Sequence, residues 1–114
     1  MKHGNSLRKF GRGKNQRKAL LSGLARSLIL KEKIKTTEAR AKSLRPFVEK
    51  MITKGKKGGL SDQRIISSKI DSESAKKIID KLSPRFMERK GGYLRITKST
   101  GKDGKKEAII EFLK

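Results

Sequence analysis

The sequence has no cysteine, and His3 is its single histidine. Without these side chains, disulfides, zinc ligation, thiolate catalysis and Ser/His or Cys/His relays are excluded. The lack of cysteine is also typical of an intracellular protein. We therefore expect no metal centre, no cofactor and no disulfide framework.

Aromatic and acidic residues are scarce as well. The chain has four Phe, one Tyr and no Trp, and only 32% of its 114 residues are hydrophobic. This composition predicts a single domain with a modest core. The chain has 11 Asp and Glu but 32 Lys and Arg, which gives a formal net charge of +21. Because such self-repulsion opposes a compact state, the charge indicates a polyanionic partner: nucleic acid, an anionic membrane surface or an acidic protein.

Long apolar runs are also missing. The longest one near the start, residues 19–30, is interrupted by Arg26 and is too short to span a bilayer. No stretch like a signal-peptide cleavage site follows it, so we predict neither a signal peptide nor a membrane helix. No carboxylate precedes Glu32, a feature shared with organellar transit peptides. The core-like density of apolar residues after Lys18 favours a structural helix instead.

Apolar periodicity predicts a helical first half. A first helix is expected from an N-cap at Asn15 to Lys31, and a short extended segment should follow around Ile34. Thr37 is the expected cap of a second helix, in which Pro46 predicts a kink or a late start. Residues 54–59, "KGKKGG", should end that helix as a flexible connector. The predicted core positions of the two helices are Leu21, Leu24, Ala25, Leu28, Ala41, Leu44, Val48, Met51 and Ile52.

In the second half of the sequence, the apolar pattern changes from helical periodicity to the alternation typical of strands. Two shorter helices are expected, capped by Ser61 and Ser72, the second ending at Ser83 and Pro84. Alternation in residues 93–98, a turn-forming "TGKDGKK" and the apolar residues 108–113 predict a C-terminal β-hairpin. The expected fold is therefore α+β, with helices packed on a small sheet. We predict a basic extension at residues 1–14 and one globular domain at 15–114.

No catalytic constellation is visible. The "GRGKN" stretch lacks the first glycine of a phosphate loop and has Asn15 where Ser or Thr would hold a metal ion. Asp71 and Glu73 lie at an expected helix start, where acids favour the helix dipole. The remaining acids that we considered are dispersed among lysines and predict surface ion pairs: Glu32, Glu49, Glu88 and Glu111. We predict that the protein is not an enzyme and has no small-molecule substrate.

The basic residues concentrate in the start of the chain, in residues 84–95 and in the hairpin loop. At such loops and element ends, Arg and Lys donors can reach a sugar-phosphate backbone. Phe10, Phe86 and Tyr93 are candidates for stacking on splayed bases, with burial as the alternative for Phe86 and Tyr93. Motifs for sequence readout are missing, so we predict recognition of phosphates and shape rather than of base sequence. The candidate RNA-binding residues are Lys2, His3, Arg8, Lys9, Arg12, Lys14, Arg17, Lys18, Arg85, Arg89, Lys90, Arg95, Lys98, Lys102 and Lys105.

Five segments resemble the bacterial large-subunit ribosomal protein seventeen family over nearly the whole chain. They are "MKHGNSLRKFGR", "RKALLSGLARSLI", "IKTTEARAKSLRPFVEKMIT", "PRFMERKGGYLRITK" and "AIIEFL". The resemblance implies a structural protein bound to large-subunit ribosomal RNA near the exit-tunnel region, with neighbouring ribosomal proteins as further partners, in the cytoplasm. Gly4, Asn5, Gln16 and Leu94 depart from the residues usual in that family.

The basic start of the chain fits this role. It has too little apolar surface to offset its ordering entropy, so we expect RNA to order it. Two other hypotheses remain open: a DNA-compacting nucleoid protein and, more remotely, an RNA-acting enzyme. DNA architecture would favour a dimer seam or an apolar wedge, and neither is evident in the sequence.

Overall fold

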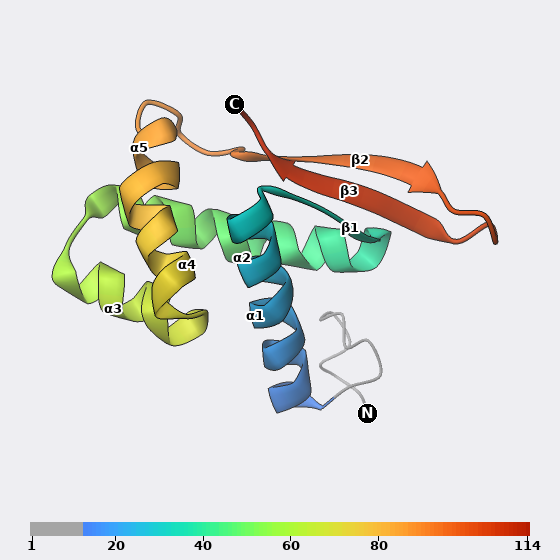
Figure 1. Cartoon of the computed structure of the whole chain (residues 1–114), viewed down its shortest axis with the longest axis horizontal. Helices are drawn as coiled ribbons and strands as arrows, with labels where there is room; N and C mark the ends of the chain where they lie inside the picture. The colour runs from blue at the N-terminus through green and yellow to red at the C-terminus, as the bar shows by residue number, and fades with distance from the viewer. Residues whose placement is uncertain (1–12) are drawn as a thin grey trace.

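The computed structural model describes residues 13–114, and the calls on Lys2, His3, Arg8, Lys9, Phe10 and Arg12 lie outside them. The described part consists of helices followed by a hairpin, with one strand between the first two helices (Figure 1). The elements are α1 (Lys14–Lys31), β1 (Lys33–Thr37), α2 (Glu38–Lys57), α3 (Leu60–Lys69), α4 (Ser72–Lys77), the π-helical turn η2 (Ile78–Leu82), α5 (Ser83–Arg85), β2 (Leu94–Thr100) and β3 (Lys106–Phe112).

The three strands form one antiparallel sheet in the order β1-β3-β2. Ile34 of β1 pairs with Ile110 of β3, which pairs with Ile96 of β2. This row faces α2, and α2 packs against all three strands. The predicted α+β fold with a C-terminal hairpin is therefore confirmed, including the short strand near Ile34.

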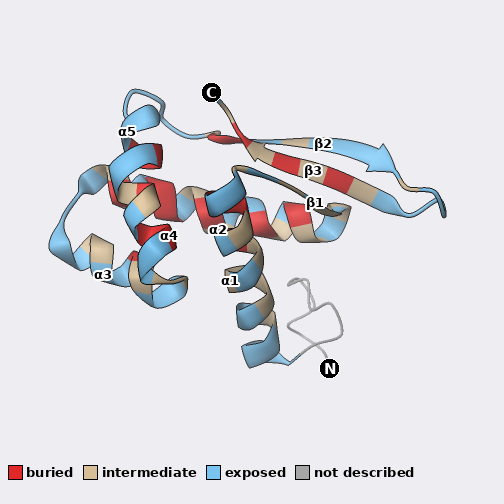
Figure 2. Ribbon diagram, viewed as in Figure 1, coloured by how far each residue is buried: buried red, intermediate tan, exposed pale blue. Residues whose placement is uncertain are grey.

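The core lies between α2, the sheet, α1 and the helical segment from α4 to α5 (Figure 2). All five predicted core residues of α2 are buried. In α1, Ala25 and Leu28 are buried, whereas Leu21 and Leu24 are half-buried and pack against the core. Apolar periodicity therefore identified the packed faces of both helices.

Three of the predicted helix caps are wrong. Gly13 is the N-cap of α1, so Asn15 lies inside the helix, and Gly59 rather than Ser61 precedes α3. Asp71 caps α4 in place of Ser72, because its carboxylate accepts a hydrogen bond from the Ser74 backbone N–H at 3.3 Å. The predicted Thr37 cap of α2 is confirmed.

Helix α2 is longer than the sequence indicated. It begins at Glu38, runs through Pro46 and continues to Lys57, so a late start and a connector from Lys54 are both wrong. Only Gly58 and Gly59 connect it to α3, with Gly58 in the left-handed conformation at φ 71°. Gly55 is buried inside the helix, and the side chains of Ser83 and Ile78 occupy the space that a Cβ atom at this position would need. A packing role thus explains a glycine that suggested a loop.

Ser83 and Pro84 do not end the helix that begins at Ser72. Elements α4, η2 and α5 are continuous from Ser72 to Arg85. The Ser83 backbone N–H donates to the Ile78 carbonyl, five residues back, and the Ser83 hydroxyl donates to the Ile52 carbonyl at 3.2 Å. Pro84 is the second residue of α5 and follows the π-helical turn directly, so the helix continues through it to Arg85. Across residues 13–114, no helix has the length and apolar character needed to cross a bilayer.

Candidate nucleic-acid interface

Two buried aromatic side chains lie at the ends of the segment between α5 and β2. Phe86 and Tyr93 flank it and are only 3% and 1% exposed. Their ring centroids lie 5.2 Å apart, and the Phe86 ring stacks on Phe112 at 6.2 Å. Base stacking by Phe86 or Tyr93 is therefore excluded, and the burial alternative is correct. Between these two rings lies a loop of residues 87–92, in which residues 87–91 are exposed and Gly92 is half-buried. We call it the 87–92 loop.

Lys56 of α2 fastens this loop to the helical body. Its ammonium group donates to the Arg89 carbonyl and to the Tyr93 hydroxyl, the latter at 3.0 Å. The same nitrogen lies 5.1 Å from the centroid of the Tyr93 ring. Burial raises the pKa of Tyr93, but the hydrogen bonds with Thr53 and Lys56 lower it by more than that, so the pKa lies below its usual value. Lys56 thus holds the 87–92 loop against α2.

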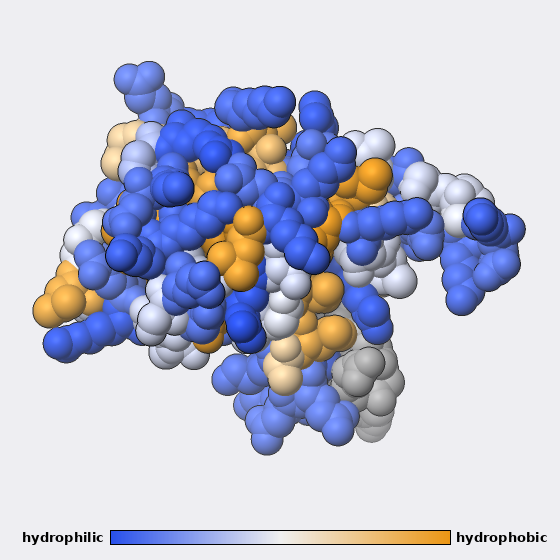
Figure 3. Space-filling view, in the orientation of Figure 1, coloured by the Kyte–Doolittle hydropathy of each residue, from blue (hydrophilic) through white to orange (hydrophobic). Residues whose placement is uncertain are grey.

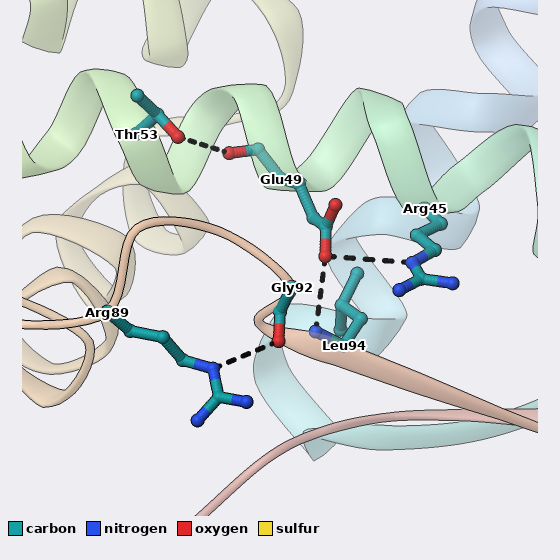
Figure 4. A network of polar contacts seen from close by, with 6 residues as sticks. All are labelled: Arg45, Glu49, Thr53, Arg89, Gly92 and Leu94. Atoms are coloured by element: carbon teal, nitrogen blue, oxygen red, sulfur yellow. Dashed lines mark hydrogen bonds and ion pairs between the residues drawn. The ribbon is translucent and has the colours of Figure 1, made fainter.

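Glu49, two turns earlier on α2, fixes the end of the loop (Figure 4). One of its carboxylate oxygens accepts from the Leu94 backbone N–H at 3.3 Å and lies 3.7 Å from Arg45 Nε. The Thr53 hydroxyl donates to the Glu49 carbonyl at 3.1 Å and lies 3.4 Å from the Tyr93 hydroxyl. The first residue of β2 is therefore tied to the middle of α2.

The loop itself presents cations. Arg89 donates through Nε to the Gly92 carbonyl at 3.2 Å, which bridges the loop (Figure 4). Gly91 and Gly92 have φ values of 153° and 64°, a range that side chains disfavour. Arg89 and Lys90 are both exposed. The contacts with α2 thus hold two exposed basic residues on a short, defined loop.

Replacing Lys56 with Met should loosen the 87–92 loop. Two hydrogen bonds from a charged donor are lost, so we expect a loss of about 1–3 kcal/mol in the free energy of unfolding. Amide hydrogen exchange of residues 87–93 should accelerate. Lys57→Met is the matched control, since Lys57 is exposed on the next position of α2. Equal exchange in the two variants would show that Lys56 does not hold the loop.

Several predicted contact residues are engaged by carboxylates. Arg85 lies 2.7 Å from Glu32, Arg95 lies 3.5 Å from Glu111, and Lys98 lies 3.5 Å from Glu38. The hydrogen bond from Arg85 holds the pKa of Glu32 below its usual value, against the opposing effect of burial, with Lys77 assisting. The hydrogen bond from Lys42 likewise lowers the pKa of Glu38. The expected surface ion pairs of Glu32, Glu49 and Glu111 are confirmed.

The other predicted basic residues have no ion-pair partner within residues 13–114. They are Lys14, Arg17 and Lys18 on the first turns of α1, Arg89 and Lys90 in the 87–92 loop, and Lys102 and Lys105 in the hairpin turn. These three groups are not brought together in one patch, since the α1 start, the loop and the hairpin turn lie at separate extremities (Figure 1). Hydrophilic side chains cover most of the visible face (Figure 3). Basic residues at three separate extremities can contact a polyanion that surrounds the protein more readily than a polyanion with a flat surface.

Comparison with known proteins places this surface in context. The model of the family "Ribosomal protein L17" matches residues 20–113. The chain belongs to the ribosomal protein L17 family. A relative from Thermodesulfovibrio yellowstonii is 48% identical over 99% of this chain and 87% of the relative. Relatives from Hydrogenobaculum sp. and Shouchella clausii are 48% and 50% identical, over 99% and 92% of this chain and 99% and 97% of their own lengths.

All three relatives carry the name "Large ribosomal subunit protein bL17". The resemblance found in the sequence is therefore confirmed. Ribosomal protein families are generally structural rather than enzymatic. As a member of the L17 family, the chain has its place in translation and in a ribonucleoprotein particle.

Sequence reasoning missed the residues that hold the interface in shape. Lys56 lies in the stretch that the sequence predicts to be a connector, and for Glu49 the sequence predicts only a surface ion pair. Phe47, half-buried on α2, was not considered as a contact residue. The first two act across 33 and 45 residues of sequence, so no local pattern marks them.

Proposed function

We propose that this L17-family protein is a structural constituent of the large ribosomal subunit that binds large-subunit ribosomal RNA through phosphate and shape contacts. The observation that carries the proposal is the 87–92 loop, which α2 holds in place while Arg89 and Lys90 remain exposed. A preordered cationic loop loses little entropy when it meets a phosphate backbone. Net charge supplies the long-range attraction.

The candidate contacts divide into two groups under this proposal. Residues without a carboxylate partner, such as Lys18, Lys90 and Lys105, can contact phosphates directly. Arg85, Arg95 and Lys98 share their charge with glutamates, so each must weaken an ion pair to bind RNA. The basic start of the chain, with Lys2, His3, Arg8, Lys9 and Arg12, adds contacts beyond the described residues.

The same proposal includes neighbouring large-subunit proteins as partners and the cytoplasmic ribosome as location. Relatives named as ribosomal proteins favour it over the DNA-compacting alternative. The proposed phosphate and shape contacts require no membrane, small-molecule substrate or cofactor.

A double substitution tests whether the exposed cations of the 87–92 loop bind RNA. Replacing Arg89 and Lys90 with Ala should weaken binding to a large-subunit rRNA transcript about 10- to 100-fold, because two charge-assisted phosphate contacts are lost. The midpoint of thermal unfolding should fall only slightly, since both side chains are exposed and the Arg89 side chain gives up one exposed hydrogen bond, to the Gly92 carbonyl.

The control is Lys50→Ala with Lys57→Ala, which removes the same charge from exposed positions on α2. If both double variants lose affinity equally, net charge rather than the 87–92 loop determines binding, and the proposal for this loop is wrong. Filter binding at fixed salt measures both.

A further inference from the structure

A groove on the other side of α2 from the sheet combines an aromatic ring with positive charge. It has a volume of about 450 Å³ and lies between α1, α2 and α3. Its lining residues are Lys18, Ala19, Leu21, Ser22, Phe47, Ser68 and Lys69. None of them is acidic, and two are exposed lysines. The groove is therefore complementary to a ligand that is both flat and anionic.

Phe47 forms the apolar wall. Residues 13–114 contain four aromatic side chains, and Phe86, Tyr93 and Phe112 are buried. Phe47 alone of these four is half-buried, packed against the core on one side. The structure thus leaves one described ring accessible for stacking.

Cations and hydroxyls surround the ring. The Lys69 ammonium group lies 5.9 Å from the Phe47 ring centroid. The Ser22 hydroxyl donates to the Lys69 carbonyl at 2.6 Å, which ties α1 to the end of α3, and the Ser68 hydroxyl donates to the Ile65 carbonyl at 2.7 Å. Both hydroxyl oxygens retain lone pairs that can accept from a base edge. The walls are held in place by these contacts before any ligand arrives.

We propose that this groove, the Phe47 groove, binds one unpaired nucleotide of the ribosomal RNA. Its base stacks on Phe47 and displaces the Lys69 ammonium group from over the ring, and Lys18 and Lys69 contact the flanking phosphates. The inference rests on the proposed function and adds a base-binding site to it. Stacking accepts any base, because every base has a π-face. The groove volume falls in the range of sites for small ligands, so a single nucleotide fits.

The test uses Phe47→Leu, which keeps apolar packing against the core but removes the stacking surface. We expect affinity for a large-subunit rRNA transcript to fall about 5- to 150-fold. Phe47→Tyr should retain the affinity, since its ring still stacks. Leu60→Ala is the control, because Leu60 is an exposed apolar residue of α3 outside the groove. If Phe47→Leu lowers the melting temperature, Ala19→Leu provides a second route, since it fills the groove without altering the ring.

Crosslinking identifies the occupant. Ultraviolet crosslinking to RNA substituted with 4-thiouridine should label a peptide that lines the groove, and mass spectrometry should find that label lost in Phe47→Leu. Unchanged RNA affinity in both Phe47→Leu and Ala19→Leu would overturn the groove proposal. So would a groove occupied by another protein or by the first residues of this chain. Failure of the wild-type protein to bind RNA would instead overturn the proposed function.

Discussion

Affinity for a large-subunit rRNA transcript should fall about 10³- to 10⁵-fold when the salt concentration rises from 50 to 200 mM. The structure leaves exposed basic residues without carboxylate partners at the start of α1, in the 87–92 loop and in the hairpin turn. Roughly six to ten phosphate contacts from these groups and from the start of the chain would release the corresponding counterions. Filter binding at a series of salt concentrations measures the slope.

The slope also identifies which cations contribute. Replacing Lys14, Lys102 and Lys105 with Gln should reduce its magnitude by about one for each residue that contacts a phosphate. A wild-type affinity that hardly changes with salt would contradict phosphate recognition altogether. A steep slope with an unchanged value in the triple variant would move the contacts to other residues.

Replacing Gly55 with Leu should destabilise the fold by about 3 kcal/mol or more. Even a Cβ atom at Gly55 would lie 2.3 Å from the Ser83 hydroxyl oxygen and 2.9 Å from a methyl carbon of Ile78. The Ser83 side chain has little freedom to move because it is buried and bonded to the Ile52 carbonyl. For a domain of this size, the melting temperature should fall by about 10–20 °C. Differential scanning calorimetry measures this.

Gly23 provides a matched control within α1. It is an exposed helical glycine, and a Cβ there would have no neighbour within 4 Å. Gly23→Leu should therefore stabilise slightly, by up to about 1 kcal/mol, through helix propensity. If Gly55→Leu is tolerated equally well, the contact between α2 and Ser83 does not determine the stability of the core.

Local periodicity predicted the helices, the hairpin and the buried face of α2, because each depends on residues that are close in sequence. The errors arose where distant residues decide. The sequence around Gly55 predicts a flexible connector, whereas Ser83 packs against this glycine within α2. Pro84 predicts a helix end, whereas the helix continues from the π-helical turn through α5. Asp71 capped α4 where Ser72 was expected, because two adjacent residues of similar capping propensity cannot be ranked by sequence alone.

The candidate site was predicted in composition but not in arrangement. The cations of the 87–92 loop and the hairpin turn are exposed as expected, whereas Arg85, Arg95 and Lys98 have glutamate partners from other elements. The role of Lys56 could not be predicted, since it depends on the tertiary contact between α2 and Arg89. For the same reason, the accessible aromatic residue proved to be Phe47 rather than Phe86 or Tyr93.

The strand order has a consequence for synthesis on a translating ribosome. β1 lies early in the chain, yet within residues 13–114 it pairs only with β3, the last strand of that range to be made. Helices α1 to α5 therefore leave the ribosome before the central strand of the sheet exists, and the apolar face of α2 that meets Ala108 and Ile110 stays uncovered until then. At about 5–20 residues per second, this interval lasts on the order of seconds. During that time the uncovered apolar face is available to chaperones, and truncation within β3 should leave the chain unable to complete its core.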